Sequence, residues 1–418
     1  MMQHPRLFII MVVLGSLLCA ALWFVGIPEC IIKHEEHNGS VNVTYMKLLV
    51  LFNETNPGYG LDVLYTNRSL HHPKAYALYA SAEAHRFQET RNKSAIENAI
   101  RAARWLVENS DLDKDGEIGW GLPFPWDAGG DGTINPENTE YAIETAMGVQ
   151  ALLDVYDAAV LTEYKSEVSE FPVIAAKAME TFLRGRFDEV DTGAIFWYST
   201  APEDSYHVIN TCSMLTGQLQ RLSCYPVANR SLFAEWADRS VLYILAHKQE
   251  DSNGNPYWMY YGDEIPGPPT LNRPNDIQHE VYTLQGLFYY KVYGGRYGYL
   301  IDARSLLATI DRFVRKTKVY ELPLGYVYTS NWQSYANSWA RVWGLGYALH
   351  FAVQLESYLN ETPSLSTKLY TILCKKYQKD GQLLLRPDDK KLPFYSRQIA
   401  FVLKGLSFYE YINIDNKK

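Results

Sequence analysis

Hydrophobic residues recur at helical spacing along most of the chain, and the pattern repeats about every 60 to 70 residues. Five copies align on a glycine, at Gly148, Gly217, Gly286, Gly344 and Gly405. A sixth copy, at 73–80, carries alanine in that place. A second amphipathic segment follows most copies, at 95–108, 171–187, 232–247, 299–314 and 364–377. This pairing predicts six helical hairpins.

The recurring glycine indicates how the hairpins pack. Glycine inside a helix costs about 1 kcal/mol relative to alanine, so its recurrence in register indicates helices that approach closely, as in an inner ring. We therefore predict an all-α fold, an (α/α)6 toroid over 71–412 with a short tail at 413–418. Turns with extended residues follow the second helices and predict short β-hairpin loops at one mouth of the ring, at 113–120, 191–197, 251–258, 324–328 and 380–385.

The amino terminus carries a targeting signal. Residues 7–27 are uncharged and apolar, long enough to cross a bilayer at about 1.5 Å per residue, so 1–28 is predicted to be a transmembrane signal-anchor or a cleaved signal peptide. Glycosylation sequons start at Asn38, Asn42, Asn53, Asn67, Asn92, Asn229 and Asn360. We expect a glycosylated stem at 29–70 and a lumenal domain, in a single-pass type II protein of the Golgi or endoplasmic reticulum, or in a secreted protein after cleavage.

Composition narrows the classes of partner. The net charge of −8 gives no basic surface for nucleic acid, and a 47% hydrophobic content is too high for a disordered chain. Aromatic residues make up 14%, which suits either a sugar-binding cleft or a large helical core. The five cysteines show neither a disulfide framework nor zinc-ligand spacing.

The repeat also predicts a polar ring. Positions seven before the aligned glycine lie on the same helical face as the glycine and point into the toroid. All five can form hydrogen bonds: Tyr141, Asn210, His279, Asn337 and Gln398. The ring predicts a ligand cleft where the inner helices begin, although polar residues of a structural toroid can also be satisfied by water and by one another.

Several titratable and aromatic residues fall near that ring. Glu144 lies one turn beyond Tyr141, Glu280 adjoins His279, and Asp127 lies in a glycine-rich loop, so these are candidates for proton transfer. Candidate substrate-binding residues are Trp126, Trp258 and Trp339 as sugar platforms, and Arg273, Arg341 and Arg397 as partners of carboxylate or sulfate groups. The alternatives are helix-terminal charges for the carboxylates and core packing for the aromatics.

One acidic loop suggests a metal. Asp111, Asp113, Asp115 and Gly116 match positions 1, 3, 5 and 6 of a calcium-binding loop, but Leu122 stands where the final glutamate belongs. A carboxylate from elsewhere, such as Asp127, would have to complete the site, and a plain aspartate-rich turn explains the same residues. We expect no required cofactor, with calcium possible.

The repeat and its aromatic loops resemble, over about 70–412, the six-hairpin superfamily of glycoside hydrolases, unsaturated glucuronyl hydrolases, polysaccharide lyases and the carboxy-terminal region of glucuronyl C5-epimerases. Phe394, Tyr395 and Ser396, which open the last inner helix, are similar to an aromatic-Tyr-Ser entry of the epimerases. Tyrosines are thought to move the C5 proton in that family, and this resemblance implies a catalytic role for Tyr395.

The first hypothesis is therefore an enzyme that acts on an oligo- or polysaccharide, with a uronic acid as the suggested substrate and proton transfer at C5, as in an epimerase or lyase. A glycoside hydrolase using Glu144 with Asp127 or Glu280 is the second hypothesis, because hydrolysis requires two carboxylates across the scissile bond. A non-catalytic glycan-binding toroid is the third. A terpene cyclase would require an aspartate-rich metal-binding motif, and none occurs on a predicted inner helix.

Overall fold

The computed structural model describes residues 43–62, 65–130, 132–262, 273–330, 332–379, 382–388 and 396–412. The predicted signal-anchor and the tail at 413–418 lie outside these ranges. Within them, no helix has the length and apolar character needed to cross a membrane.

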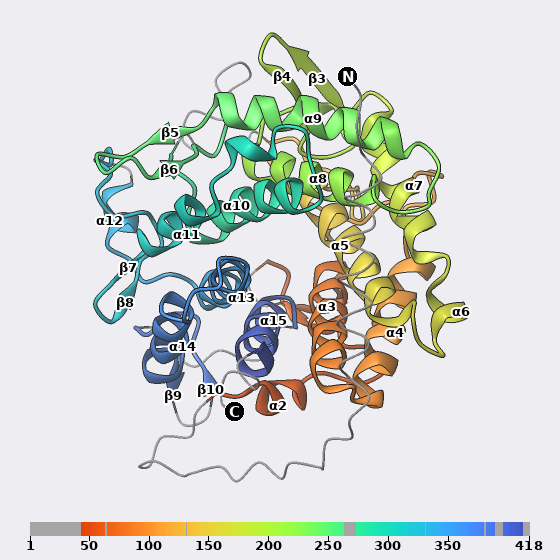
Figure 1. Ribbon diagram of the computed structural model, residues 1–418, viewed down its shortest axis with the longest axis horizontal. Helices are drawn as coiled ribbons and strands as arrows, with labels where there is room; N and C mark the ends of the chain where they lie inside the picture. The colour runs from red at the N-terminus through yellow and green to blue at the C-terminus, as the bar shows by residue number, and fades with distance from the viewer. Residues whose placement is uncertain are drawn as a thin grey trace, which may run out of the picture. The chain divides into compact units, whose positions relative to one another are not determined.

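Six long helices form a closed ring (Figure 1). They are α3 (Pro73–Thr90), α5 (Ala142–Ala159), α8 (Ile209–Leu222), α10 (Ile277–Val292), α13 (Val342–Tyr358) and α15 (Ser396–Ile412). Each packs against the next in chain order, and α15 returns to pack against α3. This ring confirms the predicted inner layer of an (α/α)6 toroid.

A second layer covers the ring from outside. It consists of α4 (Lys93–Glu108), α7 (Phe171–Leu183), α9 (Arg230–Ala246), α11 (Ala303–Asp311) and α14 (Leu365–Lys376). Each outer helix buries one apolar face, as Ala95, Ala99 and Leu106 of α4 show, whereas the inner helices are buried on nearly all sides. Shorter helices stand between them: α6 (Lys165–Val168), α12 (Gln333–Ala336), η1 (Pro202–Asp204) and η3 (Gly298–Leu300).

The sixth outer position is filled from the amino-terminal side. Helix α2 (Tyr45–Leu49) packs on α15, with the Tyr45 N–H donating to Glu410 at 2.9 Å and the Tyr45 hydroxyl bonded to Glu83. The hairpin of β1 (Tyr59–Asp62) and β2 (Arg68–His71) follows and also contacts α15. Much of the segment assigned to a stem at 29–70 is therefore part of the toroid, because α15 has an apolar face that α2 covers.

Two-stranded antiparallel hairpins lead from outer helices to the next inner helix. They pair β3 (Phe187–Val190) with β4 (Gly193–Phe196), β5 (Gln249–Glu250) with β6 (Pro256–Tyr257), β7 (Val314–Arg315) with β8 (Lys318–Val319), and β9 (Gln378–Lys379) with β10 (Gln382–Leu383). Residues 324–328, predicted to be extended, are a turn and loop, because the hairpin after α11 forms immediately at 314–319.

The recurring glycines have the predicted packing role in two pairs of inner helices. A Cβ on Gly286 of α10 would lie 2.0 Å from the carbonyl oxygen of Ser213 in α8, and a Cβ on Gly405 of α15 would lie 2.3 Å from that of Gly346 in α13. Side chains are excluded there because the backbones touch. In α13 the glycine that contacts α15 is Gly346, whereas the aligned Gly344 lies against the Ile277 side chain of α10.

The sequon asparagines within the described ranges are all exposed: Asn53, Asn67, Asn92, Asn229 and Asn360. Exposure is what attachment of a glycan requires, and glycosylation stays a prediction. Among the described cysteines, Cys212, Cys224 and Cys374 form no disulfide.

Candidate active site

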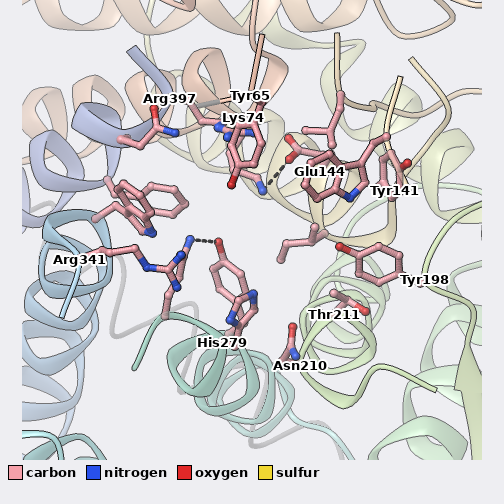
Figure 2. Close-up of a pocket in the computed structure, with 18 of the residues that line it drawn as sticks. Tyr65, Lys74, Tyr141, Glu144, Tyr198, Asn210, Thr211, His279, Arg341 and Arg397 are labelled. Atoms are coloured by element: carbon pink, nitrogen blue, oxygen red, sulfur yellow. Dashed lines mark hydrogen bonds and ion pairs between the residues drawn. The ribbon is translucent and has the colours of Figure 1, made fainter. Parts of the chain in front are cut away.

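A cavity of about 250 Å³ opens where the inner helices begin (Figure 2). Its lining brings together eight residues that the sequence singled out: Trp126, Tyr141, Glu144, Asn210, His279, Arg341, Arg397 and Gln398. Side chains near the starts of all six inner helices contribute to it. Helix amino termini carry partial positive charge, so this arrangement favours a negatively charged ligand.

The clearest catalytic geometry belongs to His279, the third residue of α10. Its Nδ1 lies 2.7 Å from a carboxylate oxygen of Asp276, the residue that caps the same helix. Burial alone would raise the pKa of Asp276, but its contacts with His279, Arg273 and Arg341 outweigh burial and hold that pKa well below the ordinary range. An ionised carboxylate only accepts hydrogen bonds, so Nδ1 carries a proton, and Nε2 is the ring nitrogen that is left to act as a base.

Glu144 reaches the cavity from the first turn of α5 and forms an ion pair with Lys74 of α3, at 2.6 Å between Oε1 and Nζ. The two side chains are 3% and 11% exposed, so the pair is nearly enclosed. Burial lowers the pKa of Lys74 in spite of the opposing effect of Glu144. This pair connects two neighbouring inner helices at the wall of the cavity.

Two arginines supply further positive charge. Arg341, the N-cap residue of α13, contacts Glu321 and lies 3.4 Å from Asp276. Arg397 of α15 has a longer contact, 3.9 Å to Asp62, and its guanidinium lies over the ring of Tyr65. The described lining thus holds three cations and one carboxylate, which suits an anionic ligand.

Aromatic rings form one wall of the cavity. Tyr65, from the turn between β1 and β2, stacks on Phe124 at 5.7 Å and meets Trp126 edge-on at 5.1 Å between ring centroids. All three line the cavity. Such a group of rings offers the apolar faces that a pyranose ring packs against.

Phenols also surround the cavity, and they are neutral at ordinary pH. Burial raises the pKa of Tyr260 to about 12 and raises those of Tyr141, Tyr198 and Tyr282 further. A neutral phenol donates a hydrogen bond or a proton and does not act as a base. His279 is therefore better suited than these tyrosines to remove a proton.

Other predicted catalytic residues lie away from the cavity lining. Glu280 is buried beside Asn275, which donates to it at 3.0 Å, and burial raises its pKa to about 8. Asp127 accepts the backbone N–H groups of Gly130 and Gly132, so it holds its own loop in a turn. Neither Glu280 nor Asp127 lines the cavity, so the catalytic roles predicted for them are corrected. Tyr395 lies outside the described residues.

Some predicted binding residues are also placed elsewhere. Trp258 is a core residue whose indole donates to the Ile244 carbonyl at 2.7 Å, and Trp339 packs edge-on against Tyr377. Asn337 is exposed after α12, because the inner helix of that copy starts five residues later. Arg273 does not line the cavity but pairs with Asp276 at 3.2 Å, so it supports the site from behind.

The lining residues that were not anticipated from the sequence include Tyr65, Lys74, Tyr198, Tyr260 and Tyr282. Lys74 carried a usable signal, because it stands at the start of the sixth repeat copy, where an inner helix was predicted. Tyr282 lies one turn after Gln278, which donates to its hydroxyl at 2.5 Å. Tyr65 had no signal, since its segment was assigned to a stem.

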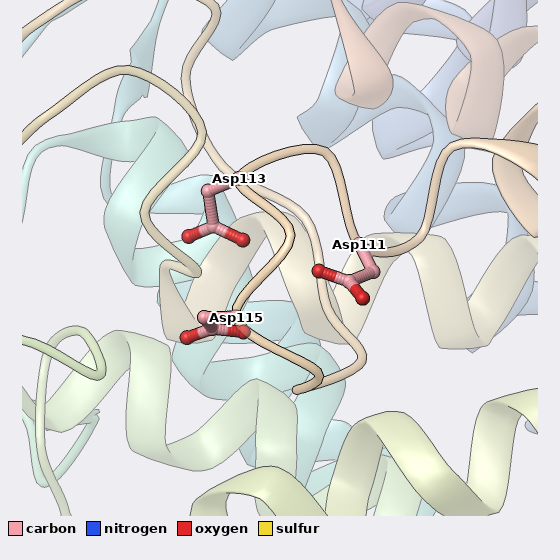
Figure 3. A group of neighbouring side chains, drawn as sticks. All are labelled: Asp111, Asp113 and Asp115. Atoms are coloured by element: carbon pink, nitrogen blue, oxygen red, sulfur yellow. The ribbon is translucent and has the colours of Figure 1, made fainter.

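The predicted metal loop brings its three aspartates together outside this cavity (Figure 3). One carboxylate oxygen from each of Asp111, Asp113 and Asp115 lies within 4.8 Å of the others, and Asp115 also groups with Glu117 and Glu140. Oxygen ligands in such a group are those that calcium prefers. Asp127 does not complete the group, and calcium binding stays a prediction.

No family model matches the sequence, and no curated protein matches it. Among solved structures, the chain is similar to D-mannose isomerase, with 14% identity over 88% of this chain and 96% of that chain and a TM-score of 0.56. It is also similar to cellobiose 2-epimerase from Bacillus thermoamylovorans (14% identity, 86% and 95% covered, TM-score 0.56). An α-1,6-mannanase from Salegentibacter has 10% identity, with 88% and 97% covered and a TM-score of 0.55. These neighbours share the six-hairpin toroid fold. At such low identity they show the fold alone, and it is the toroid that the repeat predicts.

Proposed function

We propose that the protein is a carbohydrate-active enzyme that moves a proton at a carbon atom of an acidic sugar. The substrate class is a uronic acid, and the reacting atom is C5, next to the carboxylate. The observation that carries the proposal is the Asp276–His279 pair, 2.7 Å apart, in a cavity that also holds Arg341 and Arg397.

The chemistry follows from that arrangement. A hydrogen on carbon next to a carboxylate is a very weak acid, because its removal places a second negative charge beside the first. Arginine contacts to the carboxylate disperse this charge and stabilise the transition state more than the ground state. His279 Nε2 then acts as the general base, while Asp276 keeps the proton on Nδ1.

The structural neighbours support the same class of reaction. D-mannose isomerase and cellobiose 2-epimerase are named for rearrangement of sugars, and both share this toroid. The mannanase neighbour makes hydrolysis the alternative to be tested. Hydrolysis requires two carboxylates that flank the bond, and Glu144 is the carboxylate that the described lining offers.

The test uses the full chain in deuterium oxide with two panels of oligosaccharides, one containing glucuronic or mannuronic acid and one uncharged. We expect deuterium at C5 of a uronic acid, read by mass spectrometry and NMR, and no reaction of the uncharged panel. Inversion at C5 identifies an epimerase, and an unsaturated product identifies a lyase. New reducing ends without deuterium uptake, or binding without reaction, would contradict the proposal and favour a hydrolase or a glycan-binding toroid, respectively.

A further inference from the structure

Lys74 faces His279 across the ring. In the order of inner-helix contacts, α3 and α10 are three helices apart in either direction, so they stand opposite one another. Lys74 is the second residue of α3 and His279 the third of α10, and both line the cavity. Figure 2 shows Lys74 and Glu144 on one side of the pocket and His279 on the other.

The surroundings of Lys74 suit a group that gives up and regains a proton. Among the described residues its one ion-pair partner is Glu144, and its ammonium is largely removed from water. Burial acts against the charged form, whereas Glu144 favours it, so the two effects oppose one another at this nitrogen. A lysine balanced in this way is a more usable acid than one in water.

The phenols nearest to His279 do not occupy this opposite position. Tyr260 and Tyr282 both contact the His279 ring, with centroids 5.0 and 5.7 Å away, so they belong to the same side of the cavity. A proton returned from that side would restore the original configuration at carbon. Inversion requires a donor on the far face, where Lys74 is placed.

We propose that Lys74, held by Glu144, is the second proton-transfer residue, and that the site inverts a sugar carbon with one group on each face. This inference rests on the proposed function and deepens it, because it selects epimerisation over elimination.

His279 Nε2 takes the C5 proton, and the electron pair of the C–H bond moves into the carboxylate as an enolate. The Lys74 ammonium then donates a proton to the opposite face of C5 and becomes a neutral amine. Exchange with water returns a proton to Lys74 and removes the one on His279.

The decisive variant is Lys74→Arg. Arginine keeps the positive charge and can still pair with Glu144, but its guanidinium does not release a proton near neutral pH. With a uronic acid that the wild type labels, we expect Lys74→Arg to retain exchange of the C5 hydrogen through His279 and to lose inversion by about 10²-fold or more. Retained exchange also shows that the variant is folded. Lys93→Arg, at an exposed lysine of α4, is the matched control and should react like the wild type.

His279→Gln gives the complementary result, with exchange only from the other epimer, which presents its hydrogen to Lys74. If Lys74→Arg does not fold, the double variant Lys74→Met with Glu144→Gln removes both charges together and carries the same expectation. Inversion by a folded variant within about threefold of wild type would overturn the inference and assign both faces to His279. A wild type that labels no uronic acid refutes the proposed function instead, so the two failures are distinct.

Discussion

Asp276 and His279 are joined twice at the start of α10. One carboxylate oxygen of Asp276 accepts the backbone N–H of His279 at 3.2 Å as a helix cap, and the other lies 2.7 Å from Nδ1 of the same histidine. The residue that begins the helix therefore also fixes the orientation and tautomer of the imidazole. Arg273 and Arg341 hold the carboxylate from further sides, at 3.2 and 3.4 Å.

We therefore expect Asp276→Asn to separate these two roles. Asparagine is as good a helix cap as aspartate, but it loses the ion pairs with Arg273 and Arg341, so the melting temperature should fall although the start of the helix is kept. The amide can donate to Nδ1 and place the histidine proton on Nε2, which removes the base and should lower kcat by about 10²-fold or more. The pH profile of kcat and the melting curve check this together. An unchanged rate and pH profile would show that Asp276 serves only as a cap.

We expect substitutions in the inner helices to differ in effect: those at the cavity should lower the rate, and those at helix contacts should lower stability. His279→Gln and Glu144→Gln keep side-chain size and should cost roughly 10²-fold or more in rate while folding is preserved. Gly286→Leu should act in reverse, because a Cβ there already lies 2.0 Å from the Ser213 carbonyl oxygen, and overpacking costs about 1–3 kcal/mol or more. Turnover and thermal unfolding of the three variants test the contrast. Full activity in both glutamine variants would place the chemistry elsewhere.

Much of this arrangement was predictable, because the inner helices repeat one pattern. The repeat predicted that His279, Glu144 and Arg397 lie at the mouth of the ring, and all three line the cavity. It failed at Asn337, since α13 begins only at Val342, five residues later, and Arg341 and Trp343 line the cavity instead. It failed at Glu280 for a geometric reason. Glu280 points about 100° away from His279 around the helix, and its carboxylate accepts a hydrogen bond from Asn275 outside the cavity lining.

Tertiary contacts explain the other omissions. Trp258 and Trp126 both precede an inner helix in a loop. Trp258 is buried and its indole donates to the Ile244 carbonyl, whereas Trp126 lines the cavity, and the sequence does not separate the two. Lys74 becomes informative through its partner Glu144, 70 positions later in the chain. The sequence places this lysine at the start of an inner helix, but it gives no sign of the pairing with Glu144.

Stability should fall as the pH rises from about 6.5 to 8. Burial raises the pKa of Glu280 to about 8 and that of Glu140 to about 7. Both exceed the unfolded value of about 4.3, so the folded state holds these protons more tightly and loses stability as pH rises from about 4.3 to 8. Burial lowers the pKa of His72 and His85 to about 3, so these residues favour folding as pH rises only up to about 6.5. Above about pH 6.5, the loss of stability caused by ionisation of Glu280 and Glu140 remains.

Glu280→Gln isolates this effect, because glutamine can accept the same hydrogen bond from Asn275 without a charge. We expect the variant to exceed wild type in free energy of unfolding at pH 8.5 by about 1 kcal/mol or more, since one pKa unit corresponds to about 1.4 kcal/mol. The difference should shrink toward pH 5, where the wild-type carboxyl is protonated in the folded state. Denaturant unfolding at the two pH values measures it. A constant difference would show that Glu280 does not titrate in this range.

The loop at Asp111, Asp113 and Asp115 provides the last test. Burial raises the pKa of Asp113, and Asp115 and Asp111 raise it further, so the folded loop holds like charges near one another. A divalent cation bound there would offset that repulsion and stabilise the folded state by mass action, by about 2.7 kcal/mol at a hundredfold excess over Kd. We expect calcium to raise the wild-type melting temperature relative to chelator, and Asp113→Ala to abolish the increase. Asp191→Ala, in the exposed turn between β3 and β4, is the matched control and should keep the response. Equal wild-type melting temperatures with calcium and with chelator would leave the three aspartates as a turn alone, held by the contacts of Asp111 and Asp115 with the N–H groups of Gly116 and Glu117.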